Sequence, residues 1–259
     1  MSTFTPRPGS APLARQVTAQ ARMEARLMLR NGEQLLLAIV IPVIVLVGGV
    51  LGAGRVGLDL SGRDPVDVLT PGVLALAVMS TAFTSLAIAT GFERRYGVIK
   101  RLGSSPLPRH GLLLGKVLAL LNVVVLQLVV LVVAGLVLGW RPSLEDPLVS
   151  AGSVVLAVTA GTWAFAALGL FVAGVLRAEA TLALANLVYL LLMAGGGVVL
   201  PTSAYGKAAG AIEWLPSAAL GDAMRAALVD ARLDGAAILI LLGWAVVATF
   251  LTARTFRWE

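Results

Sequence analysis

Six long stretches without a charged side chain divide the sequence, at residues 34–54, 68–92, 117–140, 147–176, 180–206 and 235–253. An α-helix needs about 20 mostly apolar residues to cross the hydrocarbon core of a bilayer. Lipid offers no hydrogen-bond partner to an open backbone, and a membrane barrel would show short alternating segments instead of continuous apolar runs. The six stretches therefore predict an all-α integral membrane protein with six transmembrane helices.

The composition agrees with this fold class. Charged residues make up 13% of the chain and hydrophobic residues 58%, whereas soluble domains carry about 25% charged residues. We expect residues 1–34 to form a cytoplasmic lead and an amphipathic interfacial helix, residues 35–254 the transmembrane domain, and residues 255–259 a cytoplasmic tail. The expected spans are about 35–54, 70–92, 113–139, 148–176, 181–200 and 235–253.

Basic residues indicate the orientation. Fourteen of the twenty lysines and arginines fall in the N-terminal segment, the second and fourth loops and the C-terminal tail. Cytoplasmic segments of membrane proteins are enriched in basic residues. We therefore expect a multi-pass protein of the cell membrane (inner or plasma membrane) with both termini in the cytoplasm. The net charge of +6 follows from this topology and does not indicate a nucleic-acid partner.

The residues that carry most enzyme chemistry are scarce. The chain has no cysteine and one histidine, His110, which argues against a thiolate nucleophile or a metal centre. The nearest approach to a phosphate-binding loop runs from Gly111 to Val117. Its spacing is one residue short and the hydroxyl after Lys116 is missing. We expect no catalytic, cofactor or metal site in this chain, and interpret Gly111 and Gly115 as close-packing positions.

The segment before the first span divides in two. Residues 1–12 contain three prolines and are interpreted as a disordered lead. Residues 13–34 favour a helix with one basic stripe, formed by Arg15, Arg22, Arg26 and Arg30. The opposite face carries Leu13, Val17, Ala21 and Met28, interrupted by Glu24. Such a helix is typical of a membrane interface, and a contact with a cytoplasmic partner is the alternative.

The second loop, residues 93–116, contains a predicted short helix from Glu93 to Leu102. Glu93 lies near its expected start, where a negative charge suits the helix dipole, and Gly103 is its expected stop. Tyr96, Ile99 and Leu102 give this helix an apolar edge. Topology explains the charges of the loop but not this edge, which favours docking on another protein.

The last loop, residues 201–234, carries seven charged residues, so it does not form a further span. Pro216 and Ser217 favour the start of a helix that caps the bundle before the last span. Its apolar face would carry Leu220, Met224, Ala227 and Leu228, with Asp222 and Arg225 on another face. We expect this helix at the extracellular surface or dipping into the outer leaflet, with a cap that does not touch substrate as the alternative.

The six uncharged stretches contain no Asp, Glu, Lys, Arg or His, whereas ion-coupled carriers usually hold ionisable residues in the membrane. Backbone carbonyls can bind sodium, so an ion-coupled secondary carrier stays as an alternative. Neutral polar residues are candidates for a substrate path or for hydrogen bonds between helices. The candidates are Thr84, Asn122, Gln127, Thr162, Asn186 and Tyr189. Three successive glycines, residues 195–197, mark a point where the fifth span can break.

Several short motifs occur in a characteristic order. They are Pro71-Gly72, Glu93-Arg94-Arg95-Tyr96-Gly97, Arg101-Leu102, Ser105-Pro106-Leu107, Gly115-Lys116, Trp214-Leu215-Pro216 and the run 222–228. In this order and spacing the sequence resembles the integral membrane subunit of ABC-2-type transporters, a group that includes daunorubicin-resistance and polysaccharide exporters. With the six spans, the resemblance covers nearly the whole chain.

The resemblance implies the permease subunit of an ATP-driven exporter of an amphipathic drug, lipid or polyketide. It implies two copies of a separate ABC ATPase, which would bind ATP and magnesium, and a second permease, either identical or paired. It makes the N-terminal helix an interfacial elbow and the second loop the ATPase-coupling element. The implied coupling residues are Glu93, Arg94, Tyr96, Gly97, Ile99, Arg101 and Leu102. A non-transporting membrane scaffold is a further alternative, disfavoured by the apolar edge.

Overall fold

A computed structural model describes residues 11–30, 32–56, 62–102, 108–143 and 145–255. The side chains of residues 33–37, 54–56, 99, 102 and 109 lie outside that description. All regular structure in the described residues is helical. The helices are α1 (Leu13–Arg30), α2 (Gly32–Val56), α3 (Pro65–Met79), the π-helical segment η1 (Ser80–Ser85), α4 (Leu86–Arg95), α5 (Val98–Leu102), α6 (Arg109–Val137), α7 (Pro147–Val175), α8 (Ala178–Gly195), the 3₁₀ segment η2 (Thr202–Ala208), α9 (Ala209–Ile212), α10 (Pro216–Leu228) and α11 (Gly235–Thr255).

Five of these helical stretches are long and apolar enough to cross a membrane. One of them, Pro65–Arg95, joins α3, η1 and α4 into a single continuous helix. The first expected span corresponds to α2, whose described apolar part, Ala38–Ala53, is shorter. The prediction of an all-α integral membrane fold is confirmed.

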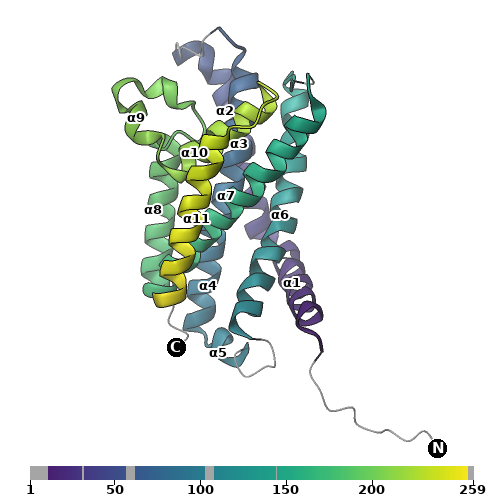
Figure 1. Cartoon of the computed structure of the whole chain (residues 1–259), viewed down its shortest axis with the longest axis vertical. Coiled ribbons are helices and arrows are strands. Elements are labelled where there is room, and N and C mark those ends of the chain that lie inside the picture. Colours follow the sequence, from purple (N-terminus) through teal and green to yellow (C-terminus); the bar gives the residue numbers. More distant parts are fainter. Residues whose placement is uncertain (1–10, 31, 57–61, 103–107, 144, 256–259) are drawn as a thin grey trace, which may run out of the picture.

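The helices form one upright bundle (Figure 1), in which α7 packs against α11, α10, α4 and α3. Small residues allow these close approaches. A Cβ at Gly161 would lie 2.6 Å from a methyl group of Leu220 on α10, and one at Gly169 would lie 2.8 Å from the Phe83 carbonyl oxygen. The core between these helices is built from fully buried apolar side chains such as Leu74, Phe165 and Met224.

Two helix boundaries differ clearly from the expected spans. The second span begins at Pro65 instead of residue 70, because proline suits the first turn of a helix and the acidic Asp67 is tolerated there. The fifth ends at Gly195 instead of residue 200. Gly197 has a φ of 70°, a conformation that glycine adopts at little cost. The break predicted from the three glycines is present.

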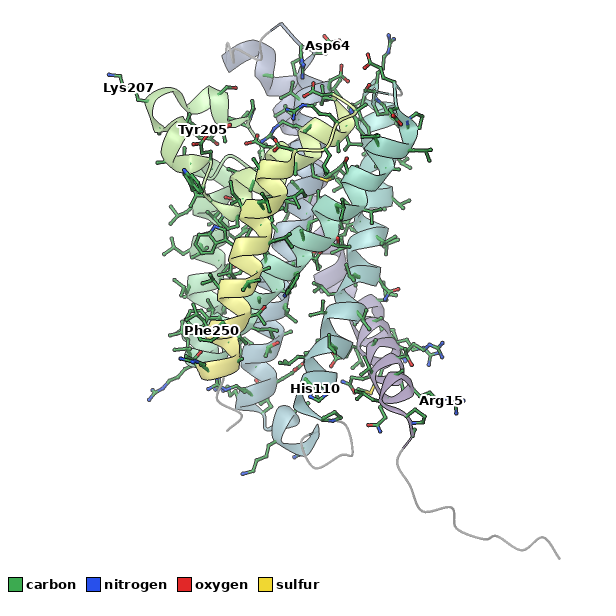
Figure 2. All side chains as sticks on the ribbon, in the orientation of Figure 1. Arg15, Asp64, His110, Tyr205, Lys207 and Phe250 are labelled. Carbon is green, nitrogen blue, oxygen red and sulfur yellow. The ribbon has the colours of Figure 1, made fainter. Side chains whose placement is uncertain are left out.

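Figure 1 places α1, α5 and the C-terminal end of α11 at one end of the bundle, and α9 at the other. In Figure 2, His110 and Arg15 lie at the first end, and Asp64 and Lys207 at the opposite end. We call these the α5 end and the α9 end. The first helix, α1, therefore begins at the same end of the bundle as the last helix, α11, finishes.

Candidate functional site

The second span ends at Arg95, and the motif Glu93–Gly97 lies in its last turn and in the turn that follows. Glu93 and Arg94 belong to α4, not to a separate short helix as the sequence suggested. The short helix α5 starts only at Val98, after Gly97, which adopts a φ of 70°. The Gly97 amide donates to the Arg94 carbonyl, 3.1 Å away. This glycine therefore ends one helix and allows the next to begin in a new direction.

A buried lysine joins three helices at the α5 end. The Lys116 side chain on α6 is 2% exposed, and its Nζ lies 3.0 Å from Oε1 of Glu24 on α1. The same Nζ lies 2.6 and 2.7 Å from the two carboxylate oxygens of Glu93 on α4. We call Glu24, Glu93 and Lys116 the charge triad. Two carboxylates share one ammonium, so the formal charges of the cluster sum to −1.

The triad depends on close packing between α1 and α6. A Cβ at Gly115 would lie 2.8 Å from Cγ of Gln20, so glycine allows this approach without displacing the Gln20 side chain. Gln20 donates through Nε2 to Oε1 of Glu24, 2.9 Å away. The inner face of α1, which includes Val17 and Ala21, is thus buried in the protein. The basic stripe of α1 is exposed as expected.

Glu24 lies on the apolar face of α1, as expected, and is buried there beside Val17 and Ala21. It lies on the face that contacts α6 because Lys116 supplies the opposite charge there. Neither Glu24 nor Lys116 was among the predicted site residues. The available signal was their placement: an acid on the apolar face of one amphipathic helix, and a lysine that opens an apolar span.

The two arginines of the motif bind α7 and α8. The Arg94 guanidinium donates to the carbonyls of Ala173 and Leu176 at the C-terminal end of α7, where the helix dipole favours a cation. Arg95 forms an ion pair with Glu179 in the first turn of α8. The last turn of α4 is therefore tied by side chains to α1, α6, α7 and α8.

The predicted apolar edge of the second loop is only partly described. Tyr96 is 66% exposed and contacts residues of its own helix end, with its ring 6.2 Å from that of Phe92 and Arg95 over its face. The side chains of Ile99 and Leu102 lie outside the described residues. Arg101 is exposed on α5. Docking through this edge stays a prediction.

A polar cluster occupies the middle of the second span, where η1 replaces regular α-helix. Thr81 donates to Oε1 of Gln127 at 2.6 Å, and Gln127 Nε2 donates to the Ala38 carbonyl at 2.8 Å. Ser80 is hydrogen-bonded to the side chain of Tyr189 on α8. Single π-helical turns inside α-helices are frequent at functional sites. The segment joins α2, α6 and α8.

The six candidate path residues do not gather on one surface. Gln127, Thr162 and Tyr189 are buried, and Thr84 is partly buried. Asn122 and Asn186 are exposed on α6 and α8, and Asn122 donates to the Leu118 carbonyl of its own helix. Gln127 and Tyr189 therefore act as contacts between helices, the alternative use that the sequence had left open. The use of this set as a substrate path stays a prediction.

At the α9 end, α10 is inserted between α3, α7 and α11 (Figure 1). Its side chains supply the hydrogen bonds that the broken end of α8 lacks. Ser217 donates to the Gly196 carbonyl at 2.7 Å. Arg225 donates to the carbonyls of Gly197, Val198 and Val199 at 2.8, 3.1 and 3.3 Å. We call Arg225 and these three carbonyls the carbonyl cluster.

The expected amphipathic cap helix is corrected in one respect: α10 is buried nearly all round, and Arg225 is among its buried residues. Burial lowers the pKa of the Arg225 guanidinium, and Asp222, 2.8 Å away, opposes that change. A Cβ at Gly72 would lie 2.3 Å from the Val199 carbonyl oxygen. The Pro71-Gly72 motif thus lets the second span touch the carbonyl cluster. Sequence reasoning missed this role because the partners of Arg225 are backbone atoms.

No group of three or more metal-ligating side chains gathers in the part of the chain that the structure describes. No curated protein matches the chain. A family model described as "ABC-2 type transporter" matches residues 15–229. This range includes the charge triad, the second loop, the polar cluster and the carbonyl cluster. Since the match covers most of the sequence, the chain belongs to the ABC-2 type transporter family and is a membrane permease component of an ABC transporter.

Proposed function

We propose that the chain is the permease of an exporter driven by a separate ATPase, and that the end of α4 together with α5 receives the motion of that ATPase. The charge triad is the observation that carries this proposal. It fixes the last turn of the second span to α1 and α6 through a lysine that is nearly fully buried. A displacement of the second loop would therefore move several spans together.

The second span offers a route from one end of the bundle to the other. Glu93 belongs to the triad near its C-terminus, η1 lies in its middle, and Gly72 touches the carbonyl cluster near its start. A rigid helix transmits a displacement along its axis. We infer that ATP-driven movement at the α5 end is delivered along this helix to α10, whose release would open the exit at the α9 end.

The complex would contain two ATPase subunits, which bind ATP and magnesium, and a second permease, identical or paired. The exposed amides of Asn122 and Asn186 on candidate spans support a second copy, because polar groups facing lipid are costly. The substrate path would then form between the two permeases. An amphipathic drug, lipid or polyketide suits such a path.

The proposed orientation has the α5 end and both termini in the cytoplasm. The chain contains no cysteine, so single cysteines can report on it. A membrane-impermeant thiol reagent added to intact cells should label Asp64→Cys and Lys207→Cys but not His110→Cys. Labelling of His110→Cys alone would reverse the orientation.

The coupling test uses the permease co-expressed with its ATPase. Gly97→Pro removes the left-handed turn, and Ile99→Asp places a charge on the predicted docking edge. Both should reach the membrane in normal amounts yet lose ATPase co-purification and transport. Lys207→Gln and Glu213→Gln, which are exposed near the α9 end, are the matched controls. Normal ATPase binding and transport in both loop variants would refute the proposal.

A further inference from the structure

A small basic cavity lies at the α5 end, between the last turn of α4, the turn after α7 and the start of α8. Its volume is about 380 Å³, and its charged lining residues are Arg94, Arg95, Arg177 and Glu179. Three cations and one anion give it a net charge of +2. The charge triad shares no residue with this lining, and the proposed docking edge meets it only where Arg95 lies over the ring of Tyr96.

The cavity is held in shape by contacts beneath it. Arg94 is fixed on the carbonyls of Ala173 and Leu176, so its charge stays at the floor. A Cβ at Gly91 would lie 3.3 Å from a methyl group of Thr181, which holds α4 and α8 in close contact. Arg95 and Arg177 are exposed at the rim. Arginine presents several donors in a planar fork that matches the oxygens of a phosphate.

The surroundings of the cavity indicate where its ligand comes from. Both bounding helices are candidate spans, Pro65–Arg95 and Ala178–Gly195, and the cavity lies at their charged ends. It is therefore at the surface of the bilayer. About one helical turn deeper on α8, Leu182 is the first of several exposed apolar side chains, which include Leu187 and Leu191 on other sides of the helix. A lipid whose headgroup enters the cavity can lay its acyl chain against the apolar surface of α8.

We propose that this cavity binds the phosphate headgroup of an anionic phospholipid. Basic pockets between transmembrane helices are suited to anionic headgroups. Glu179 sets the affinity, because its ion pair with Arg95 competes with the lipid phosphate. Lipid binding here would join α4 to α8, beside the helix end proposed to receive the ATPase motion. The lipid site does not depend on that coupling proposal.

The test measures lipid retained by the purified permease in detergent, by native mass spectrometry, with phosphatidylglycerol against phosphatidylcholine. The double variant Arg95→Gln/Arg177→Gln lowers the cavity charge from +2 to zero. Each basic side chain near an anionic lipid contributes about fivefold in affinity, so we expect the loss of two to weaken phosphatidylglycerol binding by about 25-fold. Phosphatidylcholine binding should not change. The matched control, Arg15→Gln/Arg254→Gln, removes two exposed arginines at the same end outside the cavity.

A third variant has the opposite expected sign. Glu179→Gln removes the competing carboxylate and should raise phosphatidylglycerol affinity about fivefold, a gain that a damaged fold would not produce. Inorganic phosphate at millimolar concentration should compete weakly, since it lacks the acyl chain. Equal losses in the cavity and control doubles, or unchanged binding in all variants, would overturn the site. Full displacement of lipid by millimolar phosphate would assign the cavity to free phosphate and overturn the lipid proposal.

Discussion

The two ends of the bundle each bury one cation, and they neutralise it in different ways. At the α5 end, Lys116 is held by the carboxylates of Glu24 and Glu93. At the α9 end, Arg225 is held by three main-chain carbonyls and by Asp222. Side chains can be exchanged by mutation and main-chain carbonyls cannot. The charge triad therefore joins helices through side chains alone. The carbonyl cluster, in contrast, is needed for the backbone between α8 and α10 to fold.

The two ends differ in the same way in what their contacts join. The triad joins α1, α4 and α6, three elements that are separate in sequence. Its bonds can loosen and re-form as the helices shift, while each helix keeps its own backbone hydrogen bonds. Arg225 replaces hydrogen bonds that the broken end of α8 has lost. A displacement of α10 must therefore carry Arg225 and the 197–199 backbone together.

The largest expected effect is from Arg225→Met. It leaves the carbonyls of Gly197, Val198 and Val199 without their donor in a buried place. Removing one partner of a buried charge cluster costs about 3–5 kcal/mol, and we expect the upper end because several acceptors are left unpaired. The midpoint of thermal unfolding in detergent should fall strongly. Arg232→Met, whose side chain is 59% exposed, is the control and should unfold nearly as wild type does.

Lys116→Met should have the next largest effect. The free energy of unfolding should fall by about 3 kcal/mol, because two carboxylates lose their shared cation. The triple variant Lys116→Met/Glu24→Gln/Glu93→Gln removes the unpaired charges and should regain most of that loss. Arg225→Met/Asp222→Asn should regain little, since the carbonyls remain. Thermal unfolding of these variants compares the stability regained at the two ends. Equal recovery at both ends would contradict the difference between the charge triad and the carbonyl cluster.

Two glycines test the same contrast through packing. A Cβ at Gly72 would meet a main-chain oxygen at 2.3 Å, whereas one at Gly115 would meet the side chain of Gln20 at 2.8 Å. A side chain can move aside and a buried backbone cannot. Overpacking costs about 1–3 kcal/mol, and we expect Gly72→Ala near the top of that range and Gly115→Ala at or below its lower limit. Similar unfolding midpoints for the two variants would argue against the rigid carbonyl cluster.

The smallest effect is expected midway between the ends. Thr81→Val removes the hydrogen bond to Gln127 while Gln127 keeps the Ala38 carbonyl. The loss should be about 1 kcal/mol. A double-mutant cycle with Gln127→Leu, measured by thermal unfolding, should give a coupling energy of similar size. Strict additivity of the two substitutions would mean that the bond contributes nothing to stability.

Much of the architecture could be predicted because it depends on local composition. The uncharged runs match helices of the structure to within a few residues in most cases, and the three glycines marked the end of α8. Boundaries failed where charge is tolerated, as at the start of the second span, because a helix continues until its polar residues reach the membrane surface. The prediction that Glu93 begins a separate short helix was wrong for a related reason, since the turn at Gly97 decides which helix Glu93 belongs to.

The sequence by itself determined that the chain lies in a membrane, that its apolar stretches are helical and that its basic residues collect on one side, because each depends on transferring side chains from water to lipid. Only the tertiary structure decided which buried charges meet. Glu24 and Lys116 are 92 residues apart, and Arg225 binds carbonyls that carry no mark in the sequence. Such pairings depend on how the helices pack, because neutralising a buried charge requires a particular atom within about 3 Å.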